Sequence, residues 1–176
     1  YPKIDRLLAV SEKSLQEMVF EKMYRSKAIV VGNPLDGDRI RKKAAILLPE
    51  LEGKKCDLIF VGRFAEEKNP QRFIYLVADL YNNGWSDIRA WMLGEGELQQ
   101  QCTRIIKELG LQNNIELMGF QKNPYPYIRK SRILCLTSRW EGFGLVAAEA
   151  NILGVPVLST DTAGCKEMFG DTAFEI

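Results

Sequence analysis

Histidine is absent from this 176-residue sequence. The chain therefore lacks both the commonest metal ligand and the commonest general base of enzymes. Cysteine is scarce and widely spaced, with no Cys-x-x-Cys pair among Cys56, Cys102, Cys135 and Cys165. The first three lie in or beside apolar segments, so we expect them to be reduced core thiols of a cytoplasmic protein.

Long hydrophobic runs and an excess of one charge are also missing. No apolar run approaches the roughly 18 residues that a membrane span needs, and no signal peptide is visible. The 24 basic residues nearly balance the 23 acidic ones, which gives no electrostatic reason to expect nucleic acid or an anionic membrane as a partner. Because the sequence opens at Tyr1-Pro2 without an initiator methionine, we expect a piece of a longer protein.

Strand and helix patterns alternate along most of the chain. Apolar runs predict strands at 28–31, 58–61, 88–93, 114–118, 133–137, 155–158 and 173–176. Amphipathic helices are predicted at 11–23, 69–80 and 98–109, and a loop rich in Pro and Tyr at 123–127. Strands that alternate with helices through short loops predict a parallel sheet with helices on both faces, a Rossmann-like α/β fold.

The most informative segment is residues 141–150, where a strand passes through a glycine turn into an Ala-rich helix that ends at Gly154. Glu149 lies on a face that is otherwise Leu, Val and Ala, where an ionised carboxylate is costly unless a partner satisfies it. Two adjacent hydroxyls of a ribose or hexose would do so. The turn also presents free N–H groups at a helix N-terminus, where anions bind. The segment therefore predicts a nucleotide-sugar site.

The loop after residues 58–61 carries Arg63 and Lys68. A diphosphate needs cations that hold it and that match the charge developing as it leaves. The alternative is a solvated loop in which Glu66 and Glu67 neutralise both cations. Because ligands of open parallel sheets bind at the carboxyl ends of the strands, we expect four residues that follow strand ends to converge on one crevice: Arg63, Phe120, Glu141 and Asp161.

Three other features allow two interpretations each. Glu141 and Glu149 could be a general acid and base as in glycosidases, or Glu149 could pair internally with an Arg or Lys. Gly94-Glu-Gly96 lacks the third glycine of a dinucleotide fingerprint, so a tight strand-to-helix turn is favoured. We expect the tryptophans to pack rather than to stack on a ligand, with Trp140 as the exception because it adjoins Glu141: Trp85, Trp91 and Trp140.

Together these motifs resemble the C-terminal, donor-binding half of the retaining glycosyltransferases of family 4, also called group 1, which have the GT-B fold. The resemblance covers nearly the whole chain and rests on residues 10–11, 31–36, 61–64 with Lys68, 92–97, 117–120 and 138–149. It implies two units: residues 1–27, a linker or the end of a missing N-terminal domain, and residues 28–176, a Rossmann-like domain that binds a nucleotide sugar. One departure is Ala163 before Gly164, where the family has two glycines; Ala tolerates positive φ poorly, so this loop is expected to differ.

The resemblance also implies roles for individual residues. It assigns catalysis to Arg63 and Lys68, which would bind the diphosphate and stabilise the leaving nucleotide, and to Glu141, which would face the donor hexose. It assigns donor binding to Glu149 for the ribose hydroxyls, to the N–H groups of Phe143, Gly144 and Leu145 for sugar and phosphate, and to the main chain of Phe120 and Gln121 for the base. It implies no metal ion and no cofactor besides the donor substrate.

The expected function is retaining transfer of a hexose from a nucleoside diphosphate sugar, with a UDP-sugar as the expected donor, to a glycan, a lipid-linked sugar or another hydroxyl acceptor. Half of a nucleotide-sugar epimerase and a non-catalytic nucleotide-binding module remain as alternatives. In the family the missing N-terminal domain supplies the acceptor pocket and a histidine, so this chain alone is expected to bind the donor without completing transfer. Its expected partners are the donor and that domain, with no nucleic acid and no direct membrane contact from this half. The expected location is the cytoplasm, including the inner face of the membrane for the full-length enzyme.

Overall fold

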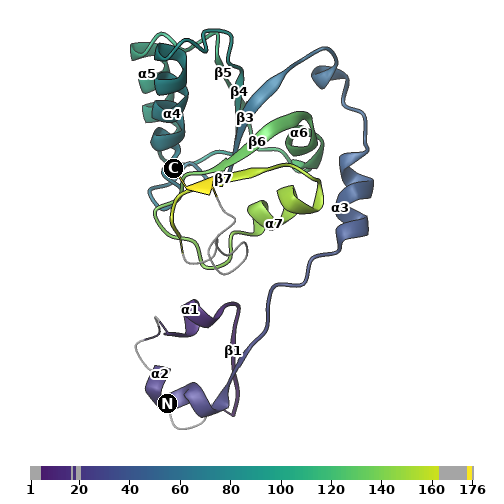
Figure 1. Ribbon diagram of the computed structural model, residues 1–176, viewed down its shortest axis with the longest axis vertical. Coiled ribbons are helices and arrows are strands. Elements are labelled where there is room, and N and C mark those ends of the chain that lie inside the picture. Colours follow the sequence, from purple (N-terminus) through teal and green to yellow (C-terminus); the bar gives the residue numbers. More distant parts are fainter. Residues whose placement is uncertain (1–4, 17, 19–20, 163–173, 176) are drawn as a thin grey trace.

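The computed structural model describes residues 5–16, 18, 21–162 and 174–175, which form a small N-terminal unit and a larger body (Figure 1). The small unit pairs β1 (Leu7–Ala9) in parallel with β2 (Ala28–Val30), and between them lie α1 (Glu12–Gln16), α2 (Glu21–Tyr24) and a 3-10 turn (Arg25–Lys27). The single helix predicted over 11–23 is thus wrong. The N–H of Met18 bonds to the carbonyl of Leu15 at 3.2 Å, a tight i−3 bond that ends α1.

The larger body is built on a parallel sheet. Its strands are β3 (Cys56–Val61), β4 (Ala90–Leu93), β5 (Ile115–Gly119), β6 (Ser131–Leu136), β7 (Val157–Ser159) and β8 (Phe174–Glu175). Among the described residues they stand in the order β5-β4-β3-β6-β7-β8, and every neighbouring pair is parallel. The chain therefore builds outward from β3 in one direction and then in the other. Ligands of open α/β sheets bind at such a switch point, outside the carboxyl ends of the strands.

Helices cover both faces of this sheet, which confirms the predicted Rossmann-like architecture. On one face lie α4 (Pro70–Asn82) and α5 (Gln99–Glu108), and on the other lie α3 (Gly37–Ala44), α6 (Tyr125–Lys130) and α7 (Leu145–Ile152) (Figure 1). A further 3-10 turn, Pro49–Leu51, precedes β3. In the described part of the chain no helix is long and apolar enough to cross a membrane.

Two of these helices differ from the sequence prediction. The prediction missed α3, which begins after Asp36; the Oδ1 atom of this N-cap residue accepts a hydrogen bond from the N–H of Arg39 at 2.9 Å. The loop predicted at 123–127 is wrong, since α6 begins at Tyr125. Pro124 and Pro126 are compatible with this helix because the first residues of a helix have no intrahelical acceptor for their N–H groups.

Successive strand residues alternate between two cores. Phe60 and Met92 pack under α4 and α5 with Phe73, whereas Trp91 and Leu134 pack under α6 and α7. All five side chains are buried. Truncating a core phenylalanine such as Phe73 to alanine typically costs about 3–5 kcal/mol, so these two layers hold the strand ends in place.

The cysteines and tryptophans test the packing predictions. The three described cysteines, Cys56, Cys102 and Cys135, are buried free thiols as predicted, and Cys165 lies outside the described residues. Trp91 is buried and packs edge-on against Tyr127, with ring centroids 6.1 Å apart. Trp85 is exposed, so the prediction that it packs is wrong: it lies in the turn after α4, where none of the described elements covers it.

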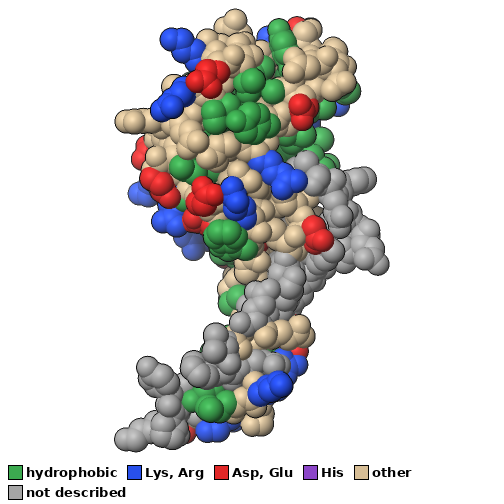
Figure 2. Space-filling view, turned by 90° about the vertical axis from the view of Figure 1, so that its left-hand side faces the viewer, with side chains coloured by type: hydrophobic (Ala, Val, Ile, Leu, Met, Phe, Trp, Pro, Cys, Tyr) green, Lys and Arg blue, Asp and Glu red, His purple; other side chains and the backbone are tan. Residues whose placement is uncertain are grey.

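Charged side chains of both signs are interspersed over the visible face of the larger body (Figure 2). Neither sign forms a continuous patch among the described residues on that face. The mixture reflects the near balance of 24 basic and 23 acidic residues in the sequence.

Candidate functional site

Two hollows meet at the carboxyl end of β3. The first, the Phe120 hollow, has a volume of about 400 Å³ and is lined by Val61, Gly62, Arg63, Leu93, Gly94, Glu95, Phe120, Gln121 and Pro124. The second, the Glu149 hollow, has a volume of about 440 Å³ and is lined by Val10, Asn33, Val61, Gly62, Lys68, Glu141, Phe143, Gly144, Leu145, Val146 and Glu149. Val61 and Gly62 line both, so the two hollows are adjacent, and they lie at the topological switch point of the sheet.

The turn between β4 and α5 passes unusually close to β3. A Cβ atom at Gly94 would lie 1.9 Å from the carbonyl oxygen of Gly62, and Gly94 also has a φ of +131°. The N–H of Gly94 bonds to the carbonyl of Gly119 at 2.9 Å, which ties the turn to β5 as well. Gly94-Glu-Gly96 is therefore the tight strand-to-helix turn that the sequence favoured, and its glycines shape the wall of the Phe120 hollow.

Lys68 and Glu141 form an ion pair inside the Glu149 hollow. The Nζ atom of Lys68 lies 2.5 Å from Oε1 of Glu141, and the hydroxyl of Ser138 donates to the same oxygen at 2.7 Å. The side chain of Glu141 is only 8% exposed and that of Lys68 29%. A carboxylate this buried needs such donors, and the pair holds the Lys68 ammonium group in the lining of the hollow.

Arg63 lies at the rim and has a different partner. Its Nη2 atom lies 2.5 Å from Oε1 of Glu67, and its side chain is 66% exposed. This hydrogen bond raises the pKa of Arg63 and lowers that of Glu67. The predicted alternative, neutralisation of both cations within the loop, thus holds for Arg63 and not for Lys68. Glu66 pairs instead with Arg139, at 2.8 Å.

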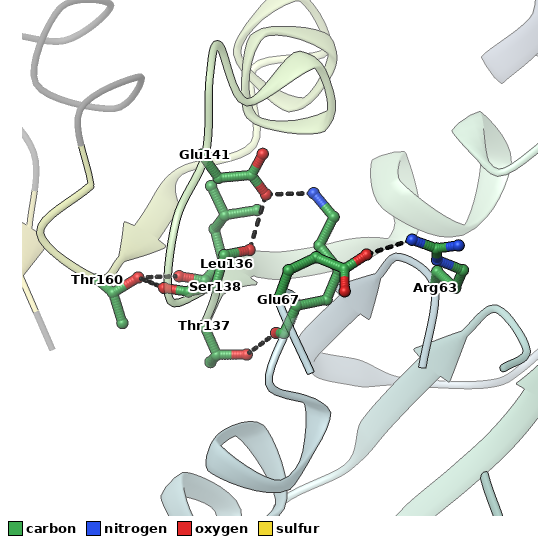
Figure 3. A network of polar contacts seen from close by, with 8 residues as sticks. Arg63, Glu67, Leu136, Thr137, Ser138, Glu141 and Thr160 are labelled. Carbon is green, nitrogen blue, oxygen red and sulfur yellow. Dashed lines mark hydrogen bonds and ion pairs between the residues drawn. The ribbon is translucent and has the colours of Figure 1, made fainter. Parts of the chain in front are cut away.

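Hydrogen bonds from side-chain hydroxyl groups connect the loop that carries Lys68 to the segment that carries Glu141 (Figure 3). The hydroxyl of Thr137 donates to the carbonyl oxygens of Lys68 and Asn69, at 3.2 and 3.1 Å. The hydroxyl of Thr160 donates to the carbonyl of Ser138 at 2.6 Å. Because Thr137, Ser138 and Thr160 are buried, these bonds have little competition from water and hold the Lys68–Glu141 pair in register.

The N-terminus of α7 opens into the Glu149 hollow. Its N-cap is Gly144, which has φ 74° and ψ 50° and contributes no side-chain cap. No described residue accepts a hydrogen bond from the N–H groups of Gly144, Leu145 or Val146. These free donors at the positive end of the helix make an anion-binding surface, as the sequence predicts for this turn.

Glu149 lies one turn inside α7 and binds a tyrosine. The hydroxyl of Tyr125 donates to its Oε1 atom at 2.9 Å. Partial burial raises the pKa of Glu149, and the hydrogen bond from Tyr125 opposes that shift. Among the described residues no Arg or Lys pairs with Glu149, so the predicted alternative of an internal ion pair is wrong.

The structure brings most of the predicted residues together. Arg63, Phe120 and Gln121 line one hollow, and Lys68, Glu141, Phe143, Gly144, Leu145 and Glu149 line the other. Asp161 lines neither. Trp140 is exposed beside the site. Residues 163–164 lie outside the described residues.

Sequence reasoning missed two functional candidates. Ser138 lies three residues before Glu141, and its place directly after the predicted strand 133–137 was a usable signal. Tyr125 carried none, since it reaches Glu149 only through the packing of α6 on α7. Within the described ranges, no group of three His, Cys, Asp or Glu side chains could hold a metal ion.

Two larger hollows, of about 710 and 860 Å³, lie at the other end of the sheet. They are lined by residues at the amino ends of the strands, including Lys54, Asp57, Glu116 and Arg132. These charges neutralise one another, since Lys54 pairs with Glu116 at 2.8 Å and Arg132 with Asp57 at 3.4 Å. None of the residues predicted for the donor site lines either of these two hollows.

Comparison with known proteins gives a family match and similar sequences. The model of the glycosyl transferases of group 1 matches residues 48–174. The chain is 33% identical over 176 residues to the N-acetylgalactosamine-N,N'-diacetylbacillosaminyl-diphospho-undecaprenol 4-alpha-N-acetylgalactosaminyltransferase of Campylobacter jejuni, a match that covers 99% of this chain and 46% of that protein. It is 29% identical over 161 residues to the lipopolysaccharide 1,6-galactosyltransferase of Escherichia coli, covering 89% of this chain and 43% of that one.

Similar solved structures confirm the fold. Anabaena Alr3699/HepE, solved with UDP-glucose, superposes with a TM-score of 0.81 at 19% identity, covering 98% of this chain and 50% of that one. A glycosyltransferase from Rickettsia africae superposes with a TM-score of 0.78 at 20% identity, covering 98% of this chain and 49% of that one. This chain thus spans about half or less of the length of each of these relatives.

Proposed function

This chain belongs to the group 1 glycosyltransferases, and we propose that it is the C-terminal, donor-binding half of a retaining hexosyltransferase of family 4 with the GT-B fold. It binds a nucleoside diphosphate sugar, a UDP-sugar, for transfer of the hexose to a hydroxyl acceptor. The observation that carries the proposal is the adjacent pair of hollows at the end of β3. They combine a carboxylate, two cations and a helix N-terminus: Glu149, Lys68, Arg63 and α7.

The donor is proposed to lie across both hollows, with the base in the Phe120 hollow. Phe120 is 69% exposed, and its backbone N–H donates only a long hydrogen bond, 3.4 Å, to Oε1 of Glu95. That N–H is therefore available to donate a hydrogen bond to a carbonyl oxygen of the base. Glu149 then accepts from the ribose hydroxyls, since its Oε2 atom has no partner among the described residues.

The diphosphate lies between Arg63, Lys68 and the free N–H groups of α7. When the bond from the anomeric carbon to the phosphate oxygen breaks, negative charge grows on the phosphate, and these donors stabilise it. The acceptor oxygen bonds to the same carbon from the same face, and its proton passes to the leaving phosphate. Lys68 is already held by Glu141, so little reorganisation is needed at that step.

The acceptor and the full reaction depend on parts of the enzyme beyond this chain, which spans less than half of the Campylobacter relative. That relative is named for transfer to a diphospho-undecaprenol-linked sugar, and the Escherichia relative for transfer to lipopolysaccharide. We propose a glycan or lipid-linked sugar as acceptor here too. The chain alone binds the donor without completing transfer.

None of the three alternatives is favoured by an observation. A glycosidase-like acid–base pair would need Glu141 open to substrate or water, but Lys68 and Ser138 occupy its Oε1 atom. A decayed, non-catalytic module is disfavoured because Arg63, Lys68, Glu141 and Glu149 all line the two hollows. An epimerase would share the donor site but need no acceptor, so acceptor-dependent transfer separates it from the proposed function.

Thermal unfolding with UDP, GDP and ADP tests the donor site. A nucleotide at 100 times its dissociation constant stabilises a protein by about 2.7 kcal/mol, worth about 5–10 °C for a chain of this size. We expect UDP to raise the midpoint of the wild type, and expect Arg63→Ala and Glu149→Ala to abolish that rise.

Arg132→Ala and Glu116→Ala are the matched controls, because they remove the same residue types at the opposite end of the sheet. Both should keep the full rise, measured from each variant's own ligand-free midpoint. The proposed function is wrong if no nucleotide at millimolar concentration moves the wild-type midpoint, or if the control variants lose the rise as well.

A further inference from the structure

Tyr125 stands on the first turn of α6 and spans the gap to α7, where its hydroxyl donates to Oε1 of Glu149 at 2.9 Å. Tyr125 and Glu149 are both partly buried. We propose that Tyr125 is a positioning residue of the donor site: its hydroxyl holds the Glu149 carboxylate ionised and turned so that the ribose 2′- and 3′-hydroxyls can reach it. The inference rests on the proposed function, because Tyr125 has this role only if Glu149 binds ribose.

The Glu149 carboxylate can bind Tyr125 and a ligand at the same time. One lone pair of Oε1 accepts from Tyr125, and the remaining lone pairs of Oε1 and Oε2 stay open toward the hollow that Glu149 lines. A free glutamate side chain loses much rotamer entropy when a ligand orders it. A carboxylate that a protein hydrogen bond already holds loses less rotamer entropy when the ligand binds, so the ligand binds more tightly.

The charges around Glu149 leave the hydroxyl of Tyr125 as its stabilising donor. From the β3–α4 loop, Lys68 lines the same hollow but pairs with Glu141. Two cations come from α3. The Nζ atom of Lys43 lies 6.0 Å from the centroid of the Tyr125 ring. Burial raises the pKa of Tyr125, and the positive charge of Arg39 opposes that shift. Neither forms a salt bridge with Glu149 in the described structure. The cations of α3 thus favour the phenol as a donor to the carboxylate.

A second tyrosine on the same helix makes the same bond away from the site. The hydroxyl of Tyr127 donates to Oε1 of Glu50 at 3.1 Å. Glu50 lies in the turn before β3 and lines neither hollow. Tyr127→Phe therefore removes one tyrosine–glutamate hydrogen bond from α6 without touching the donor site, which makes it the matched control for Tyr125→Phe.

The test compares a ribonucleotide with its 2′-deoxy counterpart by titration calorimetry on the full chain, using whichever of UDP, GDP and ADP binds. Wild type should prefer the ribonucleotide. In Tyr125→Phe we expect about a tenfold loss of ribonucleotide affinity, the size of one hydrogen bond to a charged group, and a smaller loss for the deoxynucleotide. Nucleotide affinity falls on acidification, and in Tyr125→Phe this fall should occur at a higher pH than in wild type. The reason is that the Glu149 carboxylate has lost the hydrogen bond that favours its ionised form.

Tyr127→Phe should change neither the ribose preference nor the pH at which affinity falls. In a Glu149→Gln background, Tyr125→Phe should have no further effect on the preference, which keeps the test valid if the single variant is less stable. An unchanged preference and pH response in Tyr125→Phe, with binding intact in wild type, overturns the role of Tyr125 alone. If wild type binds none of the three nucleotides, the proposed function falls together with this inference.

Discussion

The Nζ atom of Lys68 lies 2.5 Å from Oε1 of Glu141, although 73 positions separate the two residues. The contact exists because β3 and β6 are neighbours in the sheet, so the loops that follow them share one edge. It joins the basic loop to the glutamate turn and holds a cation in the hollow that the N-terminus of α7 also lines. The pair is both a structural brace and part of the proposed diphosphate site.

Burial should make the two predicted cations differ in their effect on stability. Lys68→Ala removes the cation from a carboxylate that is 8% exposed, and we expect the free energy of unfolding to fall by about 1–3 kcal/mol. Arg63→Ala removes a pair whose arginine is 66% exposed, and it should leave that free energy nearly unchanged. Urea unfolding of both variants checks the contrast. Equal losses would show that burial of the Lys68–Glu141 pair does not matter.

Glu149 should cost stability at neutral pH. Burial raises its pKa above the ordinary 4.5, so the folded state favours the protonated form, and the stability that this preference gives is lost as pH rises through the folded pKa. Glu149→Gln keeps an acceptor for Tyr125 without the charge. We expect the free energy of unfolding of this variant to increase relative to that of wild type as pH rises above 4.5. The increase should be less than about 1 kcal/mol because the group is partly solvated.

Thermal midpoints of Glu149→Gln and wild type at pH 4, 5.5 and 7 measure that gain. Glu50→Gln is the control, because its carboxylate bonds the other α6 tyrosine at an exposed position. A gap between Glu149→Gln and wild type that shrinks with rising pH would contradict the prediction. Ribonucleotide binding by Glu149→Gln should be weakened even where its stability improves, as at other sites where function and stability conflict.

Gly94 should tolerate no side chain. A Cβ atom there would lie 1.9 Å from the carbonyl oxygen of Gly62 at a φ of +131°, so β3 and the β4–α5 turn would have to separate. Gly110 also has positive φ, at +71°, but nothing lies within 4 Å of its Cβ position. We expect Gly110→Ala to cost about 1–2 kcal/mol, the strain of a left-handed residue, and Gly94→Ala to cost clearly more. Urea unfolding measures both losses of free energy. Similar losses for the two variants would show that the predicted clash at Gly94 does not occur.

The buried thiols should react slowly in the folded protein. Burial raises the pKa of Cys102 to about 11 and that of Cys135 to about 12, so the reactive thiolate is scarce at pH 8. We expect neither cysteine, nor the buried Cys56, to be alkylated within minutes by iodoacetamide, and all to be alkylated after denaturation. Mass spectrometry of digested protein assigns each site. Rapid native labelling of Cys135 would mean that the β6 core opens readily.

Local sequence determined the elements and the order of the motifs. Apolar runs marked the strands of the larger body, Gly110 and Gly154 closed two helices in the left-handed conformation, and the glycine turn at Gly144 opened α7. These features depend on residues within a few positions of one another, where backbone propensity and periodicity act. The same local reasoning identified Arg63, Lys68, Glu141 and Glu149 as site candidates.

Only the tertiary structure decided which side chains meet. Arg63 and Lys68 are five residues apart, yet one pairs within its own loop and the other across the sheet with Glu141. Glu149 receives its hydrogen bond from Tyr125, on a helix that the sequence suggested was a loop. Such partners depend on strand order and on how α6 and α7 pack. Both are set by the burial of many distant side chains at once, because no local pattern along the chain encodes the distance between two elements.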